Sequence, residues 1–109
     1  MKDVDVFAVT LDQGAIIVEF NEFASKLTGY SPKEVIGENW FEIFIKPDDL
    51  EEILDVFAGL LNGKEMYWEF TNDIFDKDNS KITLKFSNQI FINERTKERF
   101  IKSIATVIQ

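Results

Sequence analysis

The chain has 109 residues, a net charge of −8, and neither cysteine nor histidine. Its length suits a single domain over residues 1–109, and 45% hydrophobic residues are enough for one core. The missing residue types exclude disulfides, thiolate chemistry and histidine-ligated metal or haem. The acidic balance argues against nucleic acid as a partner. No apolar run is long enough to cross a membrane, so we expect no direct membrane contact.

Two runs rich in β-forming residues open the chain. They cover Val4–Leu11 and Ala15–Phe20, and the segment Asp12-Gln13-Gly14 lies between them. Gly14 is the residue that we expect to adopt a positive φ in this short loop. The pattern predicts a hairpin of two strands.

Start and stop signals predict short helices in the next stretch. Asn21 can cap a first helix, which Gly29 ends. The segment Ser31-Pro32-Lys33-Glu34 combines an N-cap serine, a proline at the first helical position and a glutamate that can close a capping box. So many caps in so few residues indicate short helices that bend around a packed core or a bound small molecule.

A longer helix is predicted from Leu50 to Asn62, where apolar residues recur at helical spacing. Pro47 is expected to end the preceding helical piece, and Asp48 is expected to cap the new helix. Asn62 and Gly63 supply its stop signal.

The remainder of the chain predicts three strands. Residues 65–74 and 81–88 alternate between apolar and polar, and Asp76–Ser80 forms the turn between them. After a polar turn at Asn93–Lys97, the segment Phe100–Ile108 is apolar on both faces, which is typical of a central strand. Two strands, several helices and three further strands predict an α+β fold with helices on one face of an antiparallel sheet.

A motif in the helical region resembles the PAS sensor family. Asn21 to Gly37 follow the pattern N-x-x-A-x-x-L-T-G-Y-S-x-x-E-V-I-G, the most recognisable stretch of that family. Pro47-Asp48-Asp49 and Lys77-Asp78-Asn79-Ser80 fall where the family has corresponding elements, and the resemblance extends from Val4 to Gln109. It implies a five-stranded antiparallel sheet in the order 2-1-5-4-3, with several short helices and one longer helix on one face. This order agrees with a central final strand.

Strand periodicity predicts which residues face the helices, on what we call the inner face of the sheet. The expected residues are Trp68, Phe70, Asn72, Ile74, Ile82, Leu84, Phe86 and Asn88. Buried asparagines would need hydrogen-bond partners, and exposure at the strand ends is the alternative. If both asparagines point inward, they can orient a ligand in an apolar pocket. The candidate ligand-binding residues are Trp40, Phe44, Phe57, Trp68, Phe70, Asn72, Leu84, Phe86 and Asn88.

The resemblance also restricts the cofactor. Flavin photosensors of this family carry a reactive cysteine where this chain has Trp40, after Gly37-Glu38-Asn39. Without cysteine or histidine, covalent flavin, cinnamoyl thioester and histidine-ligated haem are excluded. Noncovalent flavin stays open, because Trp40 or Trp68 could stack on a ring system, although Trp40 is more often a core residue. We expect no cofactor.

Two acidic clusters in the sequence could form metal or catalytic sites. Asp48 and Asp49 point apart at a helix start, where capping explains them. Asp73, Asp76 and Asp78 imitate a calcium loop but lack its glycine and its distal glutamate, which favours a hairpin turn and no metal. An isomerase-like or dehydratase-like enzyme would need a buried carboxylate base, and the inner face carries none. We therefore expect a protein that is not an enzyme.

The resemblance implies a signal-sensing and interaction module. We expect a piece of a larger bacterial signalling protein, cytoplasmic although its parent could be membrane-anchored. The output domain would be of the histidine kinase (two-component) or diguanylate cyclase type. The alternative is a ligandless dimerisation module with a collapsed core. In either case we expect a weak homodimer through the outer face of the sheet, with Tyr67, Thr71, Ala105 and Val107 as candidate contacts.

Overall fold

The protein folds around one antiparallel sheet of five strands in the order β2-β1-β5-β4-β3. The computed structural model describes residues 5–108, so the predicted boundaries at Val4 and Gln109 lie outside the described residues. The elements are β1 Phe7–Asp12, β2 Ile17–Phe20, α1 Glu22–Thr28, α2 Pro32–Val35, α3 Trp40–Phe44, α4 Pro47–Leu61, the 3₁₀ turn η1 Glu65–Tyr67, β3 Glu69–Phe75, β4 Lys81–Ile92 and β5 Arg99–Val107.

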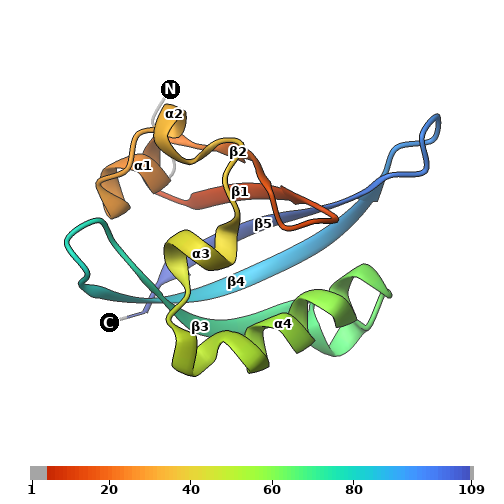
Figure 1. Ribbon diagram of the computed structural model, residues 1–109. Coiled ribbons are helices and arrows are strands. Elements are labelled where there is room, and N and C mark those ends of the chain that lie inside the picture. The colour runs from red at the N-terminus through yellow and green to blue at the C-terminus, as the bar shows by residue number, and fades with distance from the viewer. Residues whose placement is uncertain (1–4, 109) are drawn as a thin grey trace.

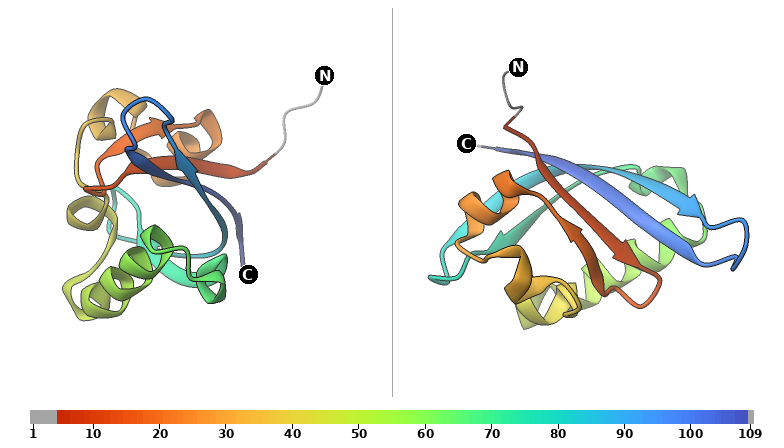
Figure 2. Two further views of the ribbon diagram at one scale, coloured as in Figure 1. Left: turned by 90° about the vertical axis from the view of Figure 1, so that its right-hand side faces the viewer. Right: turned by 90° about the horizontal axis from the view of Figure 1, so that it is seen from above.

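The helices cover one face of this sheet and leave the other bare (Figures 1 and 2). The first and last strands lie side by side in its centre, with Phe7 opposite Ala105. The α+β class, the strand order and the central final strand are therefore as predicted.

Two of the short helices begin at the predicted caps. The Asn21 side chain accepts a hydrogen bond from the Ala24 N–H at 2.9 Å, and Gly29 ends α1 with a φ of 83°. At α2 the Ser31 hydroxyl accepts from the Glu34 N–H at 3.3 Å, while the Glu34 carboxylate accepts from the Ser31 N–H at 2.8 Å. The predicted capping box is present.

The start of α4 was predicted wrongly. This helix begins at Pro47, its N-cap is Lys46, and no side chain caps it. Asp48 and Asp49 lie inside the first turn instead. The proline does not end a helix here, because its fixed φ suits the first helical position and its missing N–H needs no partner there.

The first hairpin also differs in detail from the prediction. Ala15, not Gly14, adopts the positive φ, at 63°. The Asp12 carboxylate shapes the loop by accepting from the N–H groups of Gly14 at 2.8 Å and Ile16 at 2.9 Å. An aspartate that accepts a hydrogen bond from the backbone N–H two residues ahead commonly forms a turn. In this turn the positive φ falls on the residue after the glycine.

Residues 65–68 do not belong to a strand, contrary to the predicted alternation. Glu65–Tyr67 form η1, and β3 begins only at Glu69. Trp68 is consequently 50% exposed and does not face the helices. Tyr67 packs instead on α4, where a Cβ added to Gly59 would lie 2.4 Å from its ring.

The predicted assignment of Ala105 and Val107 to the outer face of β5 is also wrong. Ala105 is 2% exposed and points inward, as Ile101 does on the same strand. Val107 shares that parity and is exposed only because the strand ends there. Ile104 and Phe100 are the β5 residues with apolar side chains on the outer face, and Ile104 is half exposed.

Candidate functional site

A cavity of about 50 Å³ lies between the helices α3 and α4 and the inner face of the sheet. Most of its lining is apolar, and no charged side chain contributes to it. The lining residues are Val9, Leu11, Trp40, Phe41, Ile53, Val56, Phe57, Leu60, Phe70, Asn72, Phe86, Asn88, Ile101 and Ser103.

Trp40 forms part of the cavity wall and also plugs the core. Its ring packs against Phe44 at a centroid distance of 4.6 Å and meets Phe7 and Phe86 edge-on at 6.1 and 6.3 Å. The Asn39 side chain starts α3 directly before it by accepting from two N–H groups. This cap and the surrounding rings fix the position of the indole.

Phe41 and Phe57 bridge the two helices next to the cavity. Their rings meet edge-on, with centroids 5.4 Å apart. Both side chains are only partly buried. Phe70 and Asn72 are the other partly buried residues of the lining, so these side chains can turn toward solvent more easily than the fully buried ones.

Asn88 is buried, and its hydrogen bonds are made within the protein. Its side-chain N–H donates to the Tyr67 carbonyl at 3.0 Å, and its side-chain oxygen accepts from the Ser103 hydroxyl at 2.6 Å. Its backbone N–H donates to the Trp68 carbonyl at 2.7 Å. Asn88 therefore joins η1 to β4 and β5, and strand-end exposure does not apply to it.

Asn72 differs from Asn88 in one respect that matters for binding. It lies on the inner face of β3 opposite Leu84, and its side-chain N–H donates to the Asp73 carbonyl at 3.1 Å. Within residues 5–108 no group donates to its side-chain oxygen. Asn72 lines the cavity and is partly exposed, so its side-chain oxygen can accept a hydrogen bond from water or from a ligand.

The structure brings most of the predicted site residues to this cavity. Those that line it are Trp40, Phe57, Phe70, Asn72, Phe86 and Asn88. Phe44 and Leu84 are fully buried in the adjoining core, and Trp68 lies outside because η1 turns it away. Sequence reasoning missed Ile101 and Ser103, because the last strand is apolar on both faces and gives no sign of which residues point inward.

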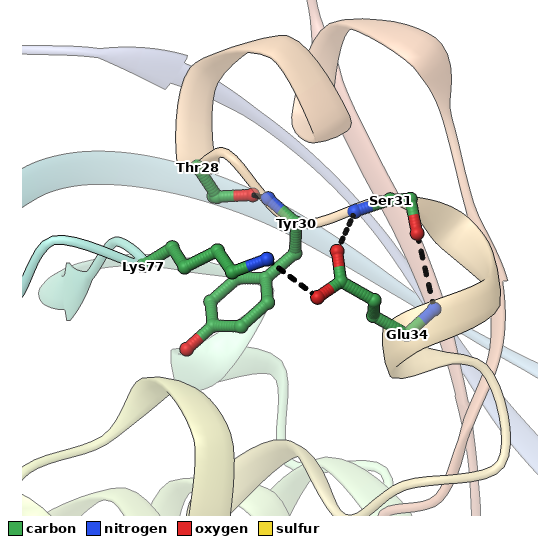
Figure 3. Close-up of polar contacts among 5 residues, drawn as sticks. All are labelled: Thr28, Tyr30, Ser31, Glu34 and Lys77. Carbon is green, nitrogen blue, oxygen red and sulfur yellow. Dashed lines mark hydrogen bonds and ion pairs between the residues drawn. The ribbon is translucent and has the colours of Figure 1, made fainter.

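A second polar cluster lies at the turn between β3 and β4 (Figure 3). The Lys77 ammonium donates to the Glu34 carboxylate at 2.6 Å, and the Lys77 backbone N–H donates to the Thr28 carbonyl at 2.8 Å. The hydrogen bond from Lys77 holds the pKa of Glu34 below its usual value, and the same bond raises the pKa of Lys77. The cluster fastens the turn to α1 and α2.

Two of the acidic residues that imitate a calcium loop in the sequence lie at this same turn between β3 and β4. The Asp76 carboxylate accepts from the N–H groups of Asp78 and Ser80 at 2.9 and 2.8 Å, as in a hairpin turn. Across residues 5–108 no three acidic, histidine or cysteine side chains gather closely enough to hold a metal ion. No helix in that range has the length and apolar character needed to cross a membrane.

Comparison with known families identifies the fold. The model of the PAS domain family matches residues 4–107. The chain belongs to the PAS domain family. The resemblance found in the sequence is confirmed, and PAS domains are sensory and interaction modules, not catalytic ones.

Two relatives match parts of this PAS domain. It is 32% identical over 92 residues to human basic helix-loop-helix ARNT-like protein 2, a match that covers 84% of this chain and 14% of the relative. It is 37% identical over 64 residues to photoactive yellow protein of Rhodothalassium salexigens, covering 58% of this chain and 51% of the relative. The matches thus span about half or less of each relative.

Solved PAS domains have the same fold at low sequence identity. The Drosophila melanogaster Cycle PAS-B domain with bound ethylene glycol is 22% identical, with a TM-score of 0.78 over 94% of this chain and 99% of that one. The Cronobacter turicensis RpfR PAS domain in complex with BDSF is 21% identical, with a TM-score of 0.77 over 100% and 99%. A Desulfitobacterium hafniense PAS domain is 15% identical, with a TM-score of 0.83 over 96% and 94%.

Proposed function

We propose that this PAS domain senses a small molecule bound noncovalently in the cavity between α4 and the sheet. The observation that carries the proposal is the side-chain oxygen of Asn72, which accepts no hydrogen bond within residues 5–108, in a cavity with a mostly apolar lining. A few polar groups among apolar walls are typical of ligand sites. The complexes of the RpfR and Cycle PAS domains support ligand binding in this fold.

The signal would pass through the sheet to an output domain outside this chain. The central strand β5 contributes Ile101 and Ser103 to the cavity, so a ligand there would contact the last strand of the sheet. A ligand can change the output only if it binds one packing of α4 on the sheet more tightly than another. We propose a bacterial parent of the histidine kinase or diguanylate cyclase type.

The bound molecule is proposed not to be a tethered chromophore or a haem. The chain has no cysteine to form a thioester or a flavin adduct, and no histidine to ligate iron. Freshly purified protein should therefore be colourless. A Soret band, or bleaching of a flavin absorption by light, would contradict this part of the proposal.

The size of the cavity favours a second candidate, a ligandless dimerisation module. Pockets for drug-sized ligands enclose about 300 Å³ or more, and this cavity encloses about 50 Å³. A core with so little free volume could serve only to support an interaction surface. The two candidates differ in whether a small molecule is ever bound.

Two measurements separate the candidates. Native mass spectrometry of protein purified from cells is expected to show a copurified small molecule. Thermal shift against a panel of small metabolites is then expected to show stabilisation of the wild type that Asn72→Leu abolishes. Ser87→Ala serves as the control, because Ser87 is exposed and does not line the cavity. If no compound copurifies and none stabilises the wild type, the ligandless module is the better account.

A further inference from the structure

We propose that the ligand of this cavity is an uncharged molecule with an apolar ring and a hydrogen-bond donor, such as a phenol or an indole. This inference rests on the proposed sensing function and names the ligand class of the same site. It follows from the charge, the free hydrogen-bonding capacity and the shape of the lining.

The charge of the ligand follows from what the lining lacks. The lining contains no lysine, arginine, aspartate or glutamate, and its polar side-chain groups are the amides of Asn72 and Asn88, the Ser103 hydroxyl and the indole N–H of Trp40. A carboxylate or ammonium placed there would lose its hydration without gaining an opposite charge, which strongly disfavours binding. The cavity therefore selects neutral molecules over anions and cations.

The donor on the ligand follows from the bonds that the protein already makes. Asn88 and Ser103 bond to each other, and the Asn88 amide N–H also bonds to the Tyr67 carbonyl. The Asn72 amide N–H bonds to the Asp73 carbonyl. The Asn72 oxygen has no donor among the described residues, and an amide oxygen can only accept. A ligand group that donates to it completes the site.

The ring on the ligand follows from the aromatic walls. Trp40, Phe57, Phe70 and Phe86 line the cavity, and aromatic rings pack well on one another edge-to-face or offset. A dry cavity of about 150 Å³ holds benzene, whereas this one is about 50 Å³. A ring can therefore enter only if the wall moves, and the partly buried Phe57 on α4 is placed to move.

This mismatch in size gives the ligand a way to signal. A molecule that fitted the cavity as it stands would leave α4 where it is. A ring that displaces the Phe57 side chain binds a state in which this side chain packs differently between α4 and the sheet, and only such a difference in affinity shifts a conformational equilibrium. The ligand class and the sensing mechanism thus depend on the same side chain.

The test uses three probes of one ring size: benzene, phenol and benzoate, titrated at pH 7 and followed by amide chemical shifts in NMR. At this pH phenol is neutral and benzoate is ionised. We expect phenol to bind about tenfold more tightly than benzene, as one added hydrogen bond allows. Benzoate should bind at least about tenfold more weakly than phenol. Shifts should concentrate at α4, β3 and β5.

Matched variants test the role of Asn72. In Asn72→Leu, phenol and benzene should bind with equal affinity, whereas Ser87→Ala should keep the wild-type ratio. Because leucine suits a strand better than asparagine does, the variant should stay folded, and its unfolding midpoint checks this. Asn72→Thr, which keeps a hydrogen-bond acceptor at that position, should bind phenol more tightly than Asn72→Leu does.

The outcomes also separate this inference from the proposed function. Benzoate binding as tightly as phenol, or an unchanged preference for phenol in Asn72→Leu, would overturn the ligand class while leaving a small-molecule sensor in place. If none of the three probes causes shifts at the cavity but a charged metabolite does, the ligand class is again wrong. If neither the probes nor any metabolite binds there, the inference and the proposed function both fall.

Discussion

Lys77, at the tip of the hairpin between β3 and β4, is joined to Glu34 on α2 by a contact of 2.6 Å between residues 43 positions apart (Figure 3). The other oxygen of the same carboxylate closes the capping box with Ser31. One glutamate thus completes the start of a helix and holds the end of the sheet against it. The pair connects a local motif of the sequence to the tertiary fold.

This contact predicts a pH dependence of stability. Lys77 holds the pKa of Glu34 below its usual 4.5, which applies in the unfolded chain. The stabilisation is therefore fully present above pH 4.5 and is lost as the pH falls through the lower, folded-state pKa. Glu34→Gln should lower the urea midpoint at pH 7, and its difference from wild type should vanish in acid.

At alkaline pH the same contact loses its stabilising effect as the pH rises, because Lys77 is then the group that titrates. The pKa of Lys77 is raised above its usual 10.5. The stabilisation that its charge contributes is therefore present below pH 10.5 and is lost as the pH rises through the raised, folded-state pKa. Added salt should shrink the effect because both groups are exposed. Glu38→Gln, at a carboxylate with no ion pair among residues 5–108, controls for net charge. A difference for Glu34→Gln that is constant from pH 3 to pH 9 would sink the prediction.

The caps of α2 and α4 predict unequal effects of two similar substitutions. Ser31→Ala removes a side chain that accepts from the Glu34 N–H and should cost about 1 kcal/mol. Asp48→Ala removes only an acid from the first turn, where its interaction with the helix dipole contributes about 0.3 kcal/mol. Chemical denaturation of both variants is the measurement, and Ser31→Thr should retain most of the stability. Equal losses for the two alanine variants would mean that the caps are assigned wrongly.

The different outcomes at Ser31 and Asp48 show what local patterns can predict. The capping box at Ser31 depends on residues three apart in the sequence, so the chain itself contains all the necessary information. At Asp48 two start signals overlap, since proline and aspartate both favour a helix start. Their order decides between them: proline takes the first helical position, and the aspartate then falls inside the helix.

The contact between Gly59 and Tyr67 predicts that the effect of Gly59→Ala on stability changes sign when Tyr67 is replaced by alanine. Alanine is intrinsically better than glycine inside a helix by about 1 kcal/mol. A Cβ at Gly59 would nevertheless lie 2.4 and 2.5 Å from atoms of the Tyr67 ring, so Gly59→Ala must displace that ring. We expect a net loss of about 1 kcal/mol or more, as overpacked sites commonly show.

Removing the tyrosine ring should reverse this effect. In a Tyr67→Ala background, Gly59→Ala should stabilise by about 1 kcal/mol, because only the helix preference remains. Urea denaturation of the four proteins gives the coupling directly. Stabilisation by Gly59→Ala in the wild-type background would show that the ring moves aside at no cost.

The limits of sequence reasoning are clearest where strand parity fails. Residues 65–74 alternate as a strand should, yet η1 takes up the first part, and this turned Trp68 outward and Tyr67 onto α4. Alternation over a few residues does not distinguish a strand from a 3₁₀ turn. Here the contact of Tyr67 with α4 decides between the two. Phe70, Asn72 and Phe86 were placed correctly because β3 and β4 have one polar face each. In β5 both faces carry apolar residues, so no polar face indicated that Ala105 points inward.

The corrected orientation of β5 sharpens the prediction of self-association. The bare outer face presents Val18, Phe91 and Ile104, which are 37, 48 and 50% exposed. We expect a weak homodimer through this face, seen as concentration-dependent sedimentation. Ile104→Glu should shift it to monomer with little loss of stability, because the side chain already faces solvent in the monomer.

Neighbouring substitutions on the same strand give the control. Ala105→Glu should lower the free energy of unfolding by about 3 kcal/mol or more, since it places a charge among Phe7, Phe86 and the rest of the core. Val107→Glu, at the end of the strand and opposite the inward-facing Leu84, should affect dimerisation less than Ile104→Glu does. A wild type that sediments as a monomer at every concentration would remove the dimer. A fully stable Ala105→Glu protein would mean that the two faces of β5 are assigned the wrong way round.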